Sequence, residues 1–222
     1  GTVNVGTMRG KSGEIVEMAA RRKLDICCVQ ESRWKGGSAR TMGSDDGCYK
    51  FFWVGCEEGV AGVGVLVAKK WINRVAEVRR VNERVMVLRL VIGKSLLNIV
   101  SVYAPQVGRT MVEKEEFYIL LGSVLKDIGE NEQLIICGDF NGHVGAEADG
   151  FEGVHGGKGF GIRNTEGEML LEFADAMGLV VGNTWFTKPD SQKITYESGG
   201  FKTQVDYVFM RREERALVSN VK

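Results

Sequence analysis

The sequence has few prolines and histidines, no excess of charge and no long apolar run. Two of its 222 residues are proline, two are histidine, and 29 basic residues balance 29 acidic ones. A surplus of positive charge is typical of proteins that bind nucleic acid regardless of sequence, so this balance argues mildly against such binding. No apolar stretch approaches the length that spans a membrane, and the N-terminus does not resemble a signal peptide. We therefore expect no membrane partner.

The five cysteines are an odd number and show no spacing typical of a metal site. Cys27, Cys28 and Cys137 lie inside apolar runs, where a free thiol behaves as a small hydrophobic side chain. This usage is typical of a reducing compartment, so we expect a nuclear or cytoplasmic protein.

Length and composition favour one domain over residues 1–222. The chain is long for one average domain and short for two, and its 44% hydrophobic and 26% charged residues are close to the globular average. No low-complexity block or repeat separates one half from the other. The first residue is not methionine, and we expect the chain to be a fragment of a longer protein. The sequence leaves its oligomeric state open.

The hydrophobic pattern predicts many strands and a few helices. Strands are expected at 2–5, 24–29, 49–54, 60–68, 84–92, 96–103, 134–137, 179–181 and 205–210. Helices are expected at 12–22, 111–128 and 165–177, with Ser12 as an N-cap and a capping box formed by Thr165 and Glu168. Ile15, Met18 and Ala19 would form the apolar stripe of the first helix. This mixture favours two packed sheets with helices outside.

The most informative segment is CGDFNG at Cys137–Gly142. An apolar strand ends here in a carboxylate, a spacer and a carboxamide. Side chains two residues apart on an extended strand point the same way, so Asp139 and Asn141 would reach one place. The segment also fits an Asx-rich turn without any chemistry. Taken alone, it leaves both interpretations open.

Polar residues also interrupt four other apolar strands. They are Asn4 in 2–5, Gln30 and Glu31 after 24–29, Tyr103 at the end of 96–103, and Asp206 in 205–210. A buried polar group is costly unless it has partners. Five such interruptions in separate strands are hard to explain as independent accidents, and they indicate one shared polar site.

In their order along the chain, these residues resemble the marks of the endonuclease/exonuclease/phosphatase superfamily. Those marks are a strand asparagine, a QE pair, a YAP-like segment, GDFN and a D[YH][IV] strand, matched here by Asn4, Gln30-Glu31, Tyr103-Ala104-Pro105, Gly138–Asn141 and Asp206-Tyr207-Val208. The segments VQESRW, SVYAPQ, CGDFNGHVG, NTWF and TQVDYVF are most similar to endonuclease domains of RTE-type LINE retrotransposons and to proteins of the craniofacial development protein 2 type. The resemblance implies a four-layered α/β sandwich, with two mainly antiparallel sheets packed together.

The resemblance also implies a metal site. Glu31 would hold Mg²⁺, with Mn²⁺ as an alternative, and Asn4 would support the site from beside it. Mg²⁺ is a hard cation that binds one or two carboxylates together with water and phosphate oxygens.

The remaining roles concern the substrate. By the resemblance, Asp139 would orient or deprotonate the attacking water, and Asn141 and Tyr103 would donate hydrogen bonds to the phosphate. Thr195 matches a polar family position near the phosphate. Arg33 lies just past Glu31, where it would either line a DNA groove or remain a solvated side chain.

Asp206 would normally orient a histidine from a C-terminal SDH-like segment, and that segment is not in the sequence. The two histidines present, His143 and His155, do not match its position and are expected in loops. We therefore expect the 222-residue chain to be strongly impaired as an enzyme.

The sequence as a whole favours a metal-dependent phosphodiesterase that nicks DNA, with a reverse transcriptase domain downstream in the full-length protein. One alternative is another superfamily phosphoesterase that acts on RNA, an inositol phosphate or a phospholipid. The other alternative is a non-catalytic DNA-binding or interaction module. Intact Glu31, Asp139, Asn141 and Asp206 argue against the second alternative.

Overall fold

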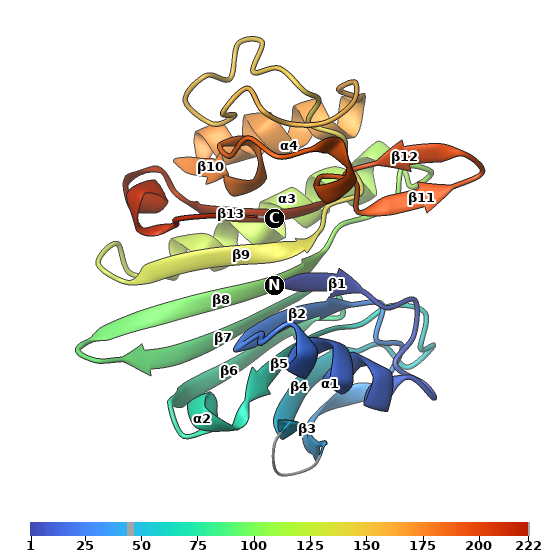
Figure 1. The fold of residues 1–222 in the computed structure, drawn as a ribbon, viewed down its shortest axis with the longest axis vertical. Helices are drawn as coiled ribbons and strands as arrows, with labels where there is room; N and C mark the ends of the chain where they lie inside the picture. Colours follow the sequence, from blue (N-terminus) through green and yellow to red (C-terminus); the bar gives the residue numbers. More distant parts are fainter. Residues whose placement is uncertain (44–46, 222) are drawn as a thin grey trace. The chain divides into compact units, whose positions relative to one another are not determined.

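The computed structural model describes residues 1–43 and 47–221, which form two compact units. The first unit comprises Gly1–Tyr103 and Cys137–Asp139, and the second comprises Ala104–Ile136 and Phe140–Lys222. A five-stranded sheet has the order β1-β2-β5-β4-β3, and a six-stranded sheet has the order β10-β13-β9-β8-β7-β6. The two sheets and their helices match the predicted α/β sandwich (Figure 1).

The first unit contains most of the strands. Its elements are β1 (Thr2–Asn4), α1 (Ser12–Arg21), β2 (Ile26–Gln30), β3 (Gly36–Met42), β4 (Tyr49–Gly55), β5 (Val63–Ala68), α2 (Lys69–Ile72), β6 (Val75–Asn82), β7 (Val85–Ile92), β8 (Ser95–Tyr103) and the end of β9 (Gln133–Asp139). β1 and β2 are parallel, whereas β2, β3, β4 and β5 pair in antiparallel fashion. Strands β2, β4 and β5 contact β6, β7 and β8, so two sheet layers pack within this unit.

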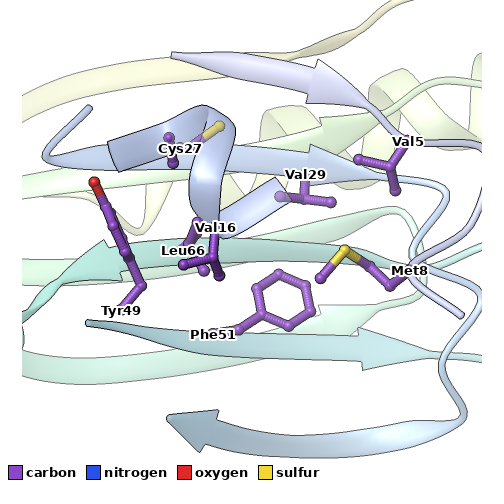
Figure 2. Close-up of a cluster of buried hydrophobic side chains, with 9 residues drawn as sticks. Val5, Met8, Val16, Cys27, Val29, Tyr49, Phe51 and Leu66 are labelled. Carbon is purple, nitrogen blue, oxygen red and sulfur yellow. The ribbon is translucent and has the colours of Figure 1, made fainter. Parts of the chain in front are cut away.

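Helix α1 covers the outer face of the five-stranded sheet through a buried apolar cluster (Figure 2). Val16 and Ala19 supply the helix side of this cluster. The sheet side consists of Cys27 and Val29 of β2, Tyr49 and Phe51 of β4, and Leu66 of β5. The predicted stripe was partly wrong, because Ile15 and Met18 are only half-buried and Val16 takes the central place.

Two glycines allow strands to approach closely. A Cβ atom at Gly64 would lie 2.4 Å from the ring of Phe51, so the absence of a side chain here allows β5 and β4 to pack closely. A Cβ atom at Gly138 would lie 2.0 Å from the carbonyl oxygen of Val102. The glycine of the GDFN segment is therefore required for β9 to lie against β8.

The second unit contains α3 (Met111–Lys126), α4 (Thr165–Ala176), β10 (Leu179–Val181), β11 (Tyr196–Ser198), β12 (Phe201–Thr203) and β13 (Asp206–Arg211), together with short 3₁₀ helices. Tyr118 of α3 packs on Phe173 of α4, with ring centroids 5.0 Å apart. Phe140 packs edge-on against Phe209 of β13. No helix among the described residues is long and apolar enough to cross a membrane.

Two predicted helix caps were wrong. The N-cap of α1 is Lys11, which makes no side-chain capping bond, rather than Ser12. The N-cap of α4 is Asn164, whose Oδ1 accepts a hydrogen bond from the backbone N–H of Gly167. A carboxamide oxygen caps as well as a hydroxyl, and Asn164 precedes Thr165 by one residue.

Candidate active site

Four of the predicted site residues come together in the first unit, each at the end of a strand. β1 ends at Asn4, β2 ends one residue before Glu31, β8 ends at Tyr103, and β9 ends at Asp139. Apolar strands thus carry four polar side chains to the place where the strands stop.

The carboxamide of Asn4 joins two carboxylates. Its Nδ2 donates hydrogen bonds to Glu31 Oε1 and to Asp139 Oδ2, both at 2.9 Å. Its Oδ1 accepts a bond from the backbone N–H of Gly6 at 2.9 Å, which fixes the orientation of the amide. Two neighbouring carboxylates repel each other, and a shared donor offsets part of that repulsion. Asn4 therefore holds both carboxylates, and its expected role beside a metal ion stays a prediction.

Glu31 has further partners on both oxygens. The hydroxyl of Tyr103 donates to Oε1 at 2.9 Å, and Nη2 of Arg33 forms an ion pair with Oε2 at 2.8 Å. Burial alone would raise the pKa of Glu31, but hydrogen bonds from Asn4, Arg33 and Tyr103 outweigh it and hold the pKa below the ordinary value. Glu31 is thus kept as a carboxylate at neutral pH.

The backbone is strained at several of these residues. Glu31, Arg33 and Asn141 have φ values of 54°, 52° and 50°, in the left-handed region that favours glycine. A residue held there costs on the order of 1–2 kcal/mol unless its surroundings impose it. Within the described part of the chain, three of the five non-glycine residues with positive φ were singled out from the sequence for the site. This concentration is typical of functional positions.

A buried polar network lies one or two residues before the site and was missed in the sequence. Thr2 Oγ1 donates to Gln30 Oε1 at 3.0 Å, and Gln30 Nε2 donates to Ser101 Oγ at 3.4 Å. Gln30 and Ser101 are fully buried. The network links β1, β2 and β8, the strands that carry Asn4, Glu31 and Tyr103. The QE pair was its only signal in the sequence.

The acidic pair fits a hard divalent cation. Among residues 1–43 and 47–221, no group of three or more His, Cys, Asp or Glu side chains is placed to hold a metal. Glu31 and Asp139 present oxygen donors on one shared amide, and one or two carboxylates are what Mg²⁺ requires from a protein.

The second unit holds Asp206 and Thr195. Asp206 begins β13, and its backbone N–H lies 3.2 Å from the hydroxyl oxygen of Thr195, which also accepts from Val205. The role of Asn183 was not predicted from the sequence. Its side chain bonds the backbone of β13 at two places. Its Nδ2 donates to the carbonyl of Asp206 at 3.3 Å, and its Oδ1 accepts from the N–H of Val208 at 2.8 Å. The structure therefore assigns Thr195 a role in holding the backbone around Asp206.

The segment after GDFN is fixed by Tyr207 in the same unit. Its hydroxyl lies 2.6 Å from the carbonyl oxygen of Gln204, 3.1 Å from that of Gly142 and 3.3 Å from the backbone nitrogen of Val144. Asn141 donates from Nδ2 to the carbonyl of Ala104 at 2.9 Å. From the sequence, Tyr207 was noted only as part of the D[YH][IV] pattern, and no role was predicted for its hydroxyl.

His155 is a buried structural residue of the glycine-rich loop. Its Nε2 lies 3.1 Å from the carbonyl oxygen of Gly145, and its Nδ1 accepts from the N–H of Gly157 at 3.0 Å. Burial lowers the pKa of His155 to about 4, so the ring is neutral at pH 7. Arg163 holds the same loop, because its guanidinium donates hydrogen bonds to the carbonyl oxygens of Val144, Glu147, Ala148 and Asp149.

Comparison with known proteins decides the family. The model of the Endonuclease/Exonuclease/phosphatase family matches residues 1–221. The chain belongs to this family. Members of the Endonuclease/Exonuclease/phosphatase family are hydrolytic nucleases and phosphatases.

Craniofacial development protein 2 of Tragulus javanicus is 30% identical over 226 residues. The alignment covers all of this chain but only 38% of that relative.

Two solved structures share the fold. The endonuclease domain of TRAS1, a telomere-specific non-LTR retrotransposon, has a TM-score of 0.65 and 16% identity over 100% of this chain and 88% of its own. The Xenopus laevis APE2 catalytic domain has a TM-score of 0.67 and 15% identity over 97% and 82%.

Proposed function

We propose that this chain is the catalytic part of a divalent-metal-dependent phosphodiesterase that nicks DNA, as a retrotransposon-type endonuclease does. The arrangement that carries the proposal is the Asn4 carboxamide between Glu31 and Asp139, with the Tyr103 hydroxyl on Glu31. Family membership limits the choice to hydrolytic chemistry on a phosphate ester. Similarity to craniofacial development protein 2 and to the TRAS1 endonuclease fold supports the element-type activity.

The chemistry follows from the two carboxylates. Glu31 and Asp139 would hold Mg²⁺ or Mn²⁺, which, when bound, polarises a phosphate oxygen and stabilises the leaving oxygen. Asp139, which accepts a hydrogen bond from Asn4, would take the proton of the attacking water. The single proton of the Tyr103 hydroxyl is donated to Glu31 in this structure, and the hydroxyl would turn from Glu31 to a phosphate oxygen as charge develops there. Asn4 keeps the two acids in fixed positions throughout.

Three residues of the second unit keep roles that stay predictions. Asn141 would donate a hydrogen bond to the phosphate, and Asp206 would orient a histidine. Thr195, by holding the backbone at Val205 and Asp206, would keep that strand end in place. We also propose that a reverse transcriptase domain follows in the full-length protein, which would use the nick as a primer.

The substrate is proposed to be double-stranded DNA with loose sequence preference. Contacts to phosphates position a nuclease without reading bases. The first unit offers Arg33, which pairs with Glu31, and the exposed cations Arg9 and Lys35, which lie near the Arg33 backbone around Gly59. The chain as a whole carries no net charge. Strong salt dependence of binding is therefore expected only from this local group.

The test is a substrate panel. The full-length natural protein and the 222-residue chain would be incubated with supercoiled plasmid, single-stranded RNA, inositol phosphates and phospholipid vesicles, in Mg²⁺ and in EDTA. We expect Mg²⁺-dependent conversion of supercoiled plasmid to the nicked form by the full-length protein. Hydrolysis of another substrate alone would replace DNA with that substrate. DNA binding without hydrolysis of any substrate would overturn the enzyme assignment in favour of a binding module.

A further inference from the structure

Arg33 forms an ion pair with Oε2 of Glu31, whereas Asn4 and Tyr103 donate hydrogen bonds to Oε1. The ion pair joins Oε2 to Arg33 Nη2 at 2.8 Å. The side chain of Glu31 is 13% exposed and that of Arg33 is 46% exposed. The guanidinium thus pairs with the oxygen of Glu31 that neither Asn4 nor Tyr103 contacts.

The backbone holds this pair in place from both sides. Ser32 is fully buried, its N–H donates to the carbonyl of Gly62, and its own carbonyl accepts from the N–H of Met8. The N–H of Arg33 donates to the carbonyl of Ala61. With positive φ at positions 31 and 33, this segment sets the direction of both side chains. The ion pair is therefore a consequence of a fixed backbone.

The same pair is easily opened. Half-exposed ion pairs contribute little to stability because water and salt compensate for their loss. Other cations lie close by, since a Cβ atom at Gly59 would be 3.0 Å from Arg9 Nη2, 3.3 Å from the carbonyl oxygen of Arg33 and 3.9 Å from Lys35 Cγ. Arg9 and Lys35 thus lie near the backbone of Arg33, and the side chains of all three residues are exposed, so this part of the surface carries three cations that favour an anion such as a phosphate.

We propose that Arg33 changes partner during substrate binding. It pairs with Oε2 of Glu31 until a divalent cation binds that oxygen, and it then binds an oxygen of the substrate phosphate. This inference rests on the proposed function. Arg33 has five N–H donors, so it can leave one carboxylate oxygen and engage a phosphate without loss of hydrogen bonding. Arg33 therefore competes with the cation in the absence of substrate and favours substrate once the cation is bound.

Calorimetric titration with Mn²⁺, without DNA, tests the competition. The proteins would be the 222-residue chain and its Arg33→Gln, Glu31→Gln and Lys35→Gln variants, each checked for thermal unfolding. Arg33→Gln should bind Mn²⁺ about two- to fivefold more tightly, because the competing cation is gone. Lys35→Gln removes an equal charge two residues away and should change Mn²⁺ affinity less.

The second readout is affinity for a short DNA duplex in Ca²⁺, measured by fluorescence anisotropy. Arg33→Gln should weaken it, so that metal and DNA affinities change in opposite directions. Weaker Mn²⁺ binding by Arg33→Gln would mean that Arg33 merely orients Glu31, and unchanged affinities would mean that it does neither. Both results overturn the inference and leave the proposed function intact. Unaltered Mn²⁺ binding by Glu31→Gln would instead refute the metal site on which the proposed function rests.

Discussion

His155 should make the protein lose stability in mild acid. The ring is 1% exposed and neutral, and it accepts a hydrogen bond from the N–H of Gly157 through Nδ1. A proton on Nδ1 would abolish that bond and place a charge in the interior. In the unfolded chain the same ring would have a pKa of about 6.5. The folded state therefore binds the proton less readily than the unfolded state.

The size of the effect follows from the two pKa values. With a pKa of about 4 in the folded protein, the contribution of His155 to stability is fully present above pH 6.5 and is lost as the pH falls toward 4. Between pH 7 and pH 5 this loss amounts to about 2 kcal/mol. Glu31 and Glu166 also have lowered pKa values, but their contributions are lost at lower pH.

Urea unfolding at pH 7, 6 and 5 measures this loss. The comparison is between the wild-type chain and His155→Gln, which keeps a hydrogen-bond donor but takes up no proton. His155→Gln should be less stable at pH 7, yet its free energy of unfolding should fall about 2 kcal/mol less than that of the wild type between pH 7 and pH 5. Parallel pH profiles for the two proteins would refute the assignment of a buried neutral imidazole.

Three further substitutions test other parts of the structure. Lys114→Met removes the partner that lies 2.7 Å from Glu166 and leaves this nearly buried carboxylate unpaired, so the free energy of urea unfolding should fall by about 3–5 kcal/mol. Adding Glu166→Gln should restore part of that free energy, and no restoration would count against the ion pair. Gly138→Ala drives a methyl group against the Val102 carbonyl and should lower the melting temperature, whereas an unchanged melting temperature would contradict the close approach of β9 and β8. Tyr207→Phe should cost about 1 kcal/mol, and a neutral result would show that its hydroxyl contributes nothing to the loop after GDFN.

Most of the core elements could be predicted because their hydrophobic pattern is strong. The predicted helices at 12–22 and 111–128 end within two residues of α1 and α3, and β10 has its predicted bounds. Strands β3 and β6 were missed since their sequences, GGSARTM and VAEVRRVN, are interrupted by polar residues and contain no fully buried residue. Such strands depend on pairing with a neighbour rather than on their own pattern, and a single sequence does not show the neighbour.

The site was predicted residue by residue, but its hydrogen bonds were not. Polar residues at the ends of apolar strands indicated Asn4, Glu31, Tyr103 and Asp139 as a group, and the structure brings them together in the first unit. The ion pair between Arg33 and Glu31 depends on the positive φ angles of both residues, and a positive φ at a residue other than glycine cannot be predicted from the sequence. Asn183 and Tyr207 lie in the NTWF and D[YH][IV] segments, but their bonds to the backbone of Val208 and Gly142 span 25 and 65 residues, so the sequence did not indicate their supporting roles.

Plasmid nicking by Asp139→Asn in the full-length protein tests the central claim most directly. Asp139→Asn keeps the size of the side chain but removes its charge and its capacity to take a proton. Glu17→Gln, on the exposed face of α1, serves as the matched control. We predict that Asp139→Asn lowers the Mg²⁺-dependent nicking rate by about 10²–10⁴-fold, while Glu17→Gln nicks at the wild-type rate. Nicking by Asp139→Asn at the wild-type rate, with its fold intact, would contradict the assignment of the active site.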